Sequence, residues 1–156
     1  TRALRYRTFA RTVKVQHPPE DRKGAAMPET PKVLIVDDEE RFCRSITKFL
    51  SIHKIAATAA LHGEAAMEAL VKNAYDVVVL DIKMPGIGGI ELMEWIQRRQ
   101  LPVEVIILSG HASMDVALEA VTFGAYDYLM KPCDIDELLA KISLAFEAKL
   151  EKEKCR

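Results

Sequence analysis

The chain has 156 residues, 49% of them hydrophobic, which is enough for one domain with a buried core and too few for two ordinary domains. No apolar run approaches the roughly 18 residues that cross a bilayer, so we expect no membrane partner. The net charge is −1, but residues 1–30 carry seven Lys or Arg against three acids, and the remainder carries fifteen against twenty. This mildly acidic remainder argues against nucleic acid as the main ligand.

The N-terminal residues 1–30 lack a sustained helical or strand pattern and include His17-Pro18-Pro19. We expect a disordered arm or upstream-translated sequence there. The alternatives are a targeting peptide and a nucleic-acid-binding tail, because the segment is rich in Arg and poor in acids.

The three cysteines do not indicate a disulfide framework or a zinc site. Cys43, Cys133 and Cys155 are odd in number and far apart in the sequence. A reducing compartment fits this usage best, so we expect a cytoplasmic protein.

From residue 32 onward, strand and helix patterns alternate five times. Apolar runs predict strands at 33–36, 54–59, 77–80, 103–108 and 126–130. Helical spacing predicts helices at 39–50, 63–72, 90–97, 112–123 and 134–148. Strands that alternate with helices of about ten residues imply right-handed crossovers and a parallel sheet covered on both faces. We expect residues 31–148 to form the domain and 149–156 an exposed charged tail or the start of a linker.

Four of the predicted strands end in polar residues. Asp37 and Asp38 follow the first strand, Asp81 the third, Ser109 the fourth and Lys131 the fifth. The carboxyl ends of parallel strands meet at one edge of the sheet, so we expect these side chains to converge there. Each also has an ordinary explanation by itself, as a helix cap, a turn or a strand exit.

Three carboxylates at one edge would repel one another, at ~4 Å and an effective dielectric of ~20, by roughly 4 kcal/mol per pair. A divalent cation removes that penalty, and oxygen-only ligands favour Mg²⁺, with Mn²⁺ as an alternative. Lys131 and the Ser109 hydroxyl can bind the oxygens of a phosphoryl group. This set of side chains fits phosphoryl transfer to a carboxylate, with Asp81 as the nucleophile.

Four motifs together resemble the receiver domain of bacterial two-component response regulators. They are VLIVDDE at 33–39, VLDIKMPG at 79–86, ILSGHA at 107–112 and GAYDYLMKP at 124–132. The resemblance covers residues 31–148. It implies a flavodoxin-like, doubly wound, five-stranded parallel sheet of order 2-1-3-4-5, with helices on both faces.

By this resemblance, Asp81 accepts a phosphoryl group from a sensor histidine kinase in a Mg²⁺-dependent reaction. Asp38 binds the Mg²⁺ directly, Asp37 mainly through water, and Lys83 through its backbone carbonyl. Lys131 is the site lysine of the family and precedes a proline whose peptide bond is cis. Such a protein is not an ordinary enzyme: it catalyses its own phosphorylation and slow dephosphorylation.

The resemblance also implies a switch made by Ser109 and Tyr128. A phosphoryl group adds about −1.5 to −2 charges, which draws Ser109 toward it and opens space for Tyr128 to turn inward. This biases the face formed by the helix 112–123, the strand 126–130 and the helix 134–148. That face is the family's output and homodimer surface. A downstream effector protein or domain is then the second partner, and the receiver is either a stand-alone protein or the N-terminal part of a transcriptional regulator.

Two other classes remain open from the residues. A phosphohydrolase of the haloacid dehalogenase kind also uses an aspartate nucleophile. It places that residue after the first strand in an Asp-x-Asp pattern, whereas this chain has Asp37-Asp38-Glu39. A phosphorylation-independent interaction module with the same fold is the other class, and DNA binding by residues 1–30 is a weaker idea.

Overall fold

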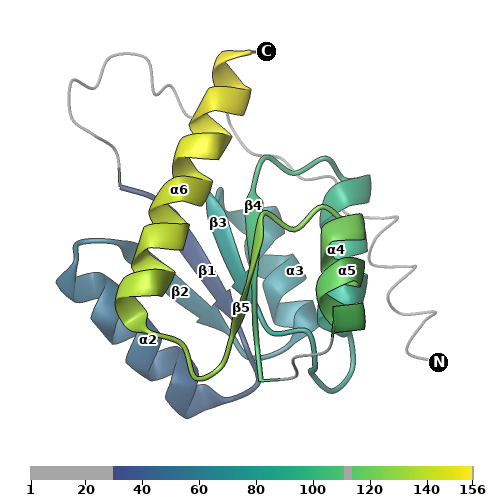
Figure 1. Cartoon of the computed structure of the whole chain (residues 1–156), viewed down its shortest axis with the longest axis horizontal. Coiled ribbons are helices and arrows are strands. Elements are labelled where there is room, and N and C mark those ends of the chain that lie inside the picture. The colour runs from purple at the N-terminus through teal and green to yellow at the C-terminus, as the bar shows by residue number, and fades with distance from the viewer. Residues whose placement is uncertain (1–29, 111–113, 156) are drawn as a thin grey trace.

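The computed structural model describes residues 30–110 and 114–155, so the expected N-terminal arm lies outside the described residues. The strands are β1 (Lys32–Val36), β2 (Ala56–Ala60), β3 (Val77–Leu80), β4 (Glu104–Ser109) and β5 (Asp127–Met130). The helices are α2 (Glu40–Ile52), α3 (Gly63–Lys72), α4 (Gly89–Arg98), α5 (Met114–Thr122) and α6 (Ile135–Lys154). Each predicted strand and helix is present, with ends that differ by a few residues (Figure 1).

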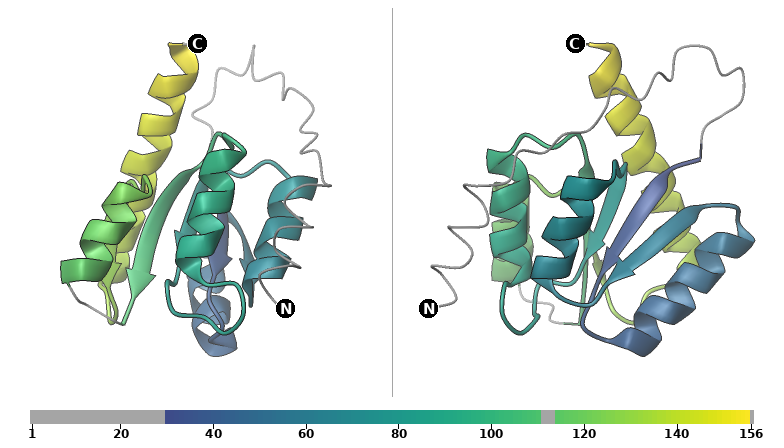
Figure 2. Two further views of the ribbon diagram at one scale, coloured as in Figure 1. Left: turned by 90° about the vertical axis from the view of Figure 1, so that its right-hand side faces the viewer. Right: turned by 180° about the vertical axis from the view of Figure 1, so that it is seen from behind.

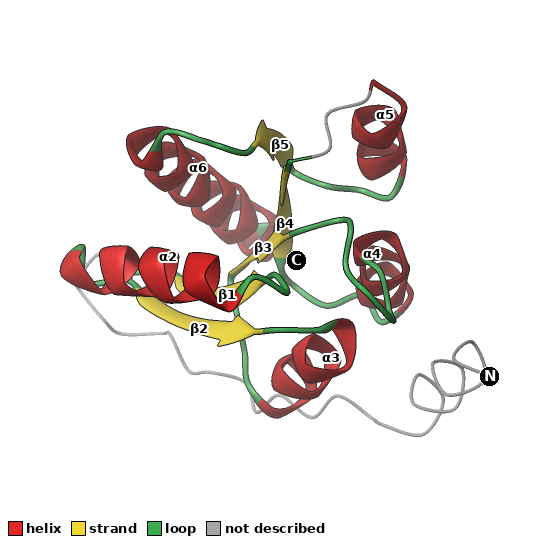
Figure 3. Ribbon diagram, turned by 90° about the horizontal axis from the view of Figure 1, so that it is seen from below, coloured by secondary structure: helices red, strands yellow, loops and turns green. Residues whose placement is uncertain are grey.

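The strands form one sheet in the order β2-β1-β3-β4-β5, and all neighbouring strands pair in parallel. Helices α2 and α6 cover one face of this sheet, and α3, α4 and α5 lie on the other (Figure 3). The prediction of a flavodoxin-like sheet of order 2-1-3-4-5 is therefore confirmed. Because all strands run the same way, their carboxyl ends lie along one edge (Figure 2).

Both faces of the central strands are buried, which explains their unbroken apolar runs. All four residues of β3 are 2% exposed or less. Val78 and Leu80 pack with α3 and α4, whereas Val77 and Val79 pack with α2 and α6. The strand that leads to Asp81 is thus held between two hydrophobic clusters.

The end of the last helix differs from the prediction. We expected it to end near residue 148 and to be followed by an exposed charged tail, but α6 runs to Lys154 and Lys149 is buried. The Lys149 ammonium pairs with the buried Asp76 carboxylate and lies 3.2 Å from Glu153. A charged residue therefore lies in the interior, where its charge is paired with a buried carboxylate.

Within the described ranges 30–110 and 114–155, we found no helix with the length and apolar character that a membrane span requires.

Candidate functional site

The carboxyl edge of the sheet brings together three predicted carboxylates. Asp37 follows β1 and Asp81 follows β3, and both are buried, whereas the neighbouring Asp38 is exposed. Asp37, Asp38 and Asp81 each offer a carboxylate oxygen, and these three oxygens lie within 4.8 Å of one another. Aspartates from two parts of the chain that lie far apart in the sequence thus form a compact acidic cluster.

Lys131, which follows β5, lies against this cluster. Its ammonium donates a hydrogen bond to Asp37 Oδ2, and its Nζ is 3.8 Å from Asp81 Oδ2 and 3.9 Å from Glu39 Oε1. Burial by itself lowers the pKa of Lys131. The hydrogen bond with Asp37 and the negative charges of Asp37, Asp81 and Glu39 outweigh burial and raise this pKa above its usual value. The side chain is therefore a firmly charged ammonium at the mouth of the site.

The Lys131–Pro132 peptide bond is cis, as the family resemblance implies.

Asp81 is held by two donors. The backbone N–H of Lys83 donates to Asp81 Oδ1 at 3.2 Å, and the side chain of Ser109, the last residue of β4, also hydrogen-bonds the carboxylate. Burial and then the charge of Asp37 raise the pKa of Asp81 above its usual value, although Lys131 and both donors oppose the shift. The carboxylate is oriented by the protein, yet its negative charge is incompletely balanced.

Asp37 is fixed from the backbone side. The N–H of Glu39 donates to Asp37 Oδ1 at 2.9 Å, and the Asp37 backbone oxygen accepts a hydrogen bond from the Cys43 thiol at 3.3 Å. Burial raises the pKa of that thiol to about 11, so Cys43 stays protonated. The N-cap residue of α2 is Glu39, which makes no side-chain cap hydrogen bond, so neither aspartate is the N-cap residue itself.

The loop after Asp81 depends on a glycine. A Cβ on Gly89 would lie 2.6 Å from the backbone oxygen of Asp81 and 2.6 Å from Cα of Ile82. The Gly89 N–H also donates to the Ile82 carbonyl at 2.9 Å. The start of α4 therefore packs directly against the peptide of Asp81 and closes the loop 82–88 beside the acidic cluster.

Ser109 and Tyr128 point to the same side of the sheet. Tyr128 pairs with Ile107 and Met130 pairs with Ser109, and side chains two residues apart on a strand share a face. Tyr128 is half-buried and packs against the hydrophobic cluster of α3 and α4. A hydroxyl beside Asp81 and an aromatic ring on the next strand are thus neighbours.

Sequence reasoning did not assign site roles to Glu39 and Phe42. The Phe42 ring lies under the Lys131 ammonium, with Nζ 4.1 Å from its centroid. From the sequence, Phe42 is placed only within the helix predicted at 39–50. The available signal was its position one helical turn after Asp38, which places it at the same end of α2.

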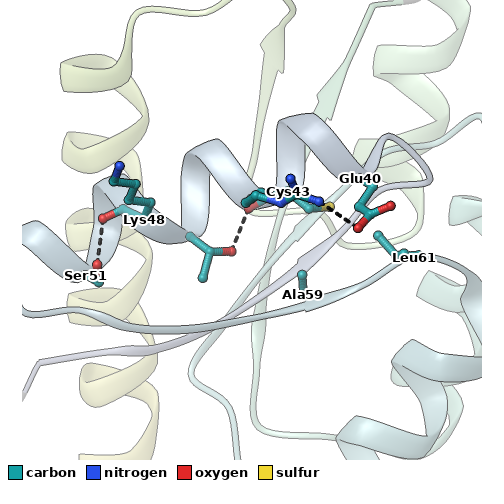
Figure 4. A pocket seen from close by; sticks show the side chains of 8 residues that line it. Glu40, Cys43, Lys48, Ser51, Ala59 and Leu61 are labelled. Carbon is teal, nitrogen blue, oxygen red and sulfur yellow. Dashed lines mark hydrogen bonds and ion pairs between the residues drawn. The ribbon is translucent and has the colours of Figure 1, made fainter.

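A groove of about 510 Å³ lies nearby between α2 and β2 (Figure 4). Its lining includes Cys43, Lys48 and Leu61, but not the three clustered aspartates. It is therefore a separate surface from the acidic cluster.

The donor set of the cluster fits a hard divalent cation. Among the residues 30–110 and 114–155, three aspartate oxygens come together, no sulfur or nitrogen ligand joins the group, and the Lys131 ammonium faces them. Mg²⁺ prefers oxygen ligands and keeps several waters, so a site that supplies a few carboxylates suits it.

The fold and site together define a class: a doubly wound α/β domain with an acidic cluster and one lysine at the carboxyl edge of its sheet. The chain belongs to the response regulator receiver domain family, whose family model matches residues 33–143.

Two transcriptional regulators are similar in sequence to this chain, which supports the family assignment. The chain is 35% identical over 124 residues to the DNA-binding transcriptional regulator NtrC of Escherichia coli (strain K12), a match that covers 80% of this chain and 26% of NtrC. It is 33% identical over 113 residues to the transcriptional regulatory protein FixJ of Bradyrhizobium diazoefficiens, covering 72% of this chain and 55% of FixJ. The chain thus matches only a part of each of these longer proteins.

Solved structures give the same result. The receiver domain of the Francisella response regulator 1452 is 34% identical, with a TM-score of 0.72 over 76% of this chain and 98% of that domain. A response regulator receiver domain from Clostridium thermocellum is 31% identical, with a TM-score of 0.72 over 76% of this chain and 96% of that one.

Proposed function

We propose that Asp81 is the phosphoacceptor of this receiver and that a sensor histidine kinase is its phosphodonor. The observation that carries the proposal is the joint position of the three clustered aspartates and Lys131, whose Nζ is 3.8 Å from Asp81 Oδ2. An aspartate with an unbalanced charge, opposite an ammonium that can bind phosphoryl oxygens, is the arrangement that phosphoryl transfer to a carboxylate needs.

In the transfer step, a carboxylate oxygen of Asp81 attacks the phosphorus of the donor phosphohistidine. The new O–P bond forms as the P–N bond breaks, and the electron pair of that bond returns to the imidazole nitrogen. The Lys131 ammonium balances charge on the phosphoryl oxygens, and the Ser109 hydroxyl donates to one of them. The Lys83 N–H keeps Asp81 Oδ1 oriented during the attack.

We propose Mg²⁺ as the cofactor, with Mn²⁺ as an alternative. Asp38 and Asp81 would bind it directly, Asp37 mainly through water, and Lys83 through its backbone carbonyl. When bound, the ion neutralises carboxylate and phosphoryl charge. The Glu39 N–H and the Cys43 thiol hold Asp37 in place beside this site.

The proposed output is a change at the face formed by α5, β5 and α6. Ser109 moving toward the phosphoryl group would let Tyr128 turn inward. Among the described residues, five of the seven large hydrophobic side chains that are exposed lie on this part of the chain: Leu118, Val121, Tyr126, Met130 and Leu144. Their exposure supports a docking role for this face, either for a second copy of the receiver or for an effector.

The wider role follows from the relatives and is proposed on that basis. NtrC and FixJ are named as transcriptional regulators, and each is longer than the part matched here. We propose a cytoplasmic protein in which the receiver, with α6 attached to the sheet through Lys149, acts on an effector protein or domain that regulates transcription.

Incubation with acetyl phosphate and Mg²⁺ tests the phosphoacceptor. Intact-mass analysis should show the gain of one phosphoryl group, and Asp81→Asn should abolish it. Asp115→Asn, which changes an exposed aspartate of α5, is the matched control and should behave as wild type. Uptake by Asp81→Asn equal to that of wild type contradicts the assignment.

A further inference from the structure

In the described part of the chain, the Lys131 ammonium lies against an aromatic ring as well as against carboxylates. Its Nζ lies 4.1 Å from the ring centroid of Phe42, and the Lys131 side chain is only 15% exposed. Phe42 comes from α2 and packs with the hydrophobic cluster between α2 and α6. A half-buried aromatic face thus covers an ammonium that is largely removed from water, the setting in which a cation–π contact is strongest.

The other neighbours of the ammonium are poorly suited to holding it during the reaction. Asp37 and Asp81 belong to the acidic cluster, so a bound dication competes with Lys131 for their charge. Glu39 is 68% exposed, and its attraction at 3.9 Å is screened by solvent.

The ring of Phe42 differs from these carboxylates in kind. Its attraction for a cation comes from the quadrupole of the ring face, and the ring has no lone pair to offer as a metal ligand. We therefore expect the contact of the ring with the ammonium to persist when a metal occupies the aspartates.

We propose that Phe42 is a positioning residue for phosphoryl transfer, whose ring face keeps the Lys131 ammonium beside Asp81 when the carboxylates are engaged elsewhere. This inference rests on the proposed function of Lys131. It predicts that the electron density of the ring, and not only its volume, controls the rate of Asp81 phosphorylation.

The kinetic test is a series of rings at position 42. We expect Phe42→Leu to slow phosphorylation by acetyl phosphate and Mg²⁺ by about three- to tenfold, and Phe42→Trp to retain the wild-type rate. Progressively fluorinated phenylalanines at position 42 nearly preserve the size of the ring, and each added fluorine should lower the logarithm of the rate. Equal rates across the fluorinated series would overturn the proposal in favour of simple packing.

Phe49 supplies the matched control. It lies on the same helix, is also half-buried, and its ring contacts His53 at a centroid distance of 4.7 Å rather than an ammonium. Phe49→Leu should leave the phosphorylation rate unchanged. A loss equal to that of Phe42→Leu would point to general damage to α2.

A second readout does not depend on phosphorylation. The ring current of Phe42 should move the NMR signals of the Lys131 ε-methylene protons upfield, and Phe42→Leu should abolish this shift. The shift should survive the addition of Mg²⁺, and its loss on that addition contradicts the proposal. If Asp81 of the wild-type protein takes up no phosphoryl group while the ring-current shift persists, the proposed function is wrong although the Phe42–Lys131 contact exists.

Discussion

The two ends of β3 carry the same pair of residue types and use them differently. Asp76 precedes the strand and pairs with Lys149, and Asp81 follows it and lies near Lys131. At the amino end, the backbone N–H of Lys32 also donates to Asp76 Oδ2 at 2.8 Å, so the carboxylate has an ammonium and an amide. At the carboxyl end, the Lys131 ammonium faces four carboxylates among the described residues, those of the three clustered aspartates and Glu39.

This difference in charge balance separates a structural ion pair from a reactive site. A buried carboxylate matched by a buried ammonium and an amide attaches α6 to the sheet. A cluster with more carboxylates than ammonium groups keeps unsatisfied charge, which a cation and a phosphoryl group can use. The same residue types therefore stabilise one end of the strand and equip the other for chemistry.

Breaking the amino-terminal pair should give the largest loss of stability. Lys149→Met leaves Asp76, which is 1% exposed, without its ammonium, and we expect the free energy of unfolding to fall by about 3–5 kcal/mol. Urea denaturation measures the loss. Lys72→Met, which removes an exposed pair with Glu68, is the control and should cost far less. Equal losses in the two variants would mean that the buried Asp76–Lys149 pair contributes no more to stability than an exposed ion pair.

Mg²⁺ should stabilise the folded protein by binding to the aspartates at the carboxyl end of β3, and not to the ion pair at its amino end. At a concentration about a hundred times its dissociation constant, the ion should raise the free energy of unfolding by roughly 2.7 kcal/mol, and a chelator should reverse the gain. Asp38→Asn should lose most of it. Thermal melting with and without Mg²⁺ reports both results. An undiminished gain in Asp38→Asn would place the ion elsewhere.

Replacing the charged Asp81 by a neutral residue should also raise the free energy of unfolding of the metal-free protein, by less than Mg²⁺ does in wild type. Burial and the charge of Asp37 raise the pKa of Asp81. The folded protein therefore binds this proton more tightly than the unfolded chain, and that stability is lost as pH rises through the raised pKa. Asp81→Asn avoids the cost of ionisation, so its unfolding midpoint in urea should exceed that of wild type at neutral pH.

The advantage of Asp81→Asn should shrink as pH falls through the raised pKa of Asp81 and should be largely gone below the ordinary aspartate value of 3.8. A variant that is less stable than wild type at neutral pH would show that the contacts of Asp81 with Lys131 outweigh its desolvation.

The smallest effect concerns Cys43, which lies behind Asp37. Because burial raises the pKa of this thiol from 9.0 to about 11, its stabilising contribution is fully present below 9.0 and is lost as pH rises through about 11. At mildly alkaline pH, iodoacetamide should modify the exposed Cys155 first and Cys43 last. Peptide mass mapping gives the order, and early labelling of Cys43 would mean that α2 opens readily from the site.

The sequence by itself determined the sheet and the membership of the acidic cluster. Apolar runs such as Val77–Leu80 indicate strands that are buried on both faces. The carboxyl ends of parallel strands lie at one edge of the sheet. The side chains of Asp37, Asp81 and Lys131 therefore had to come together at that edge. Local pattern was sufficient because each of these residues directly follows an apolar strand.

Only the tertiary structure decided which partners the lysines find. The bond from Lys131 to Asp37 spans 94 residues, and the bond from Lys149 to Asp76 spans 73. Helical spacing places Lys149 on the buried face of α6 with Leu138, Ile142 and Ala145. No local pattern identifies Asp76 as its partner, and none places the Phe42 ring over Lys131. Such contacts depend on how helices pack across the sheet, and periodicity reports only which side of a helix is apolar.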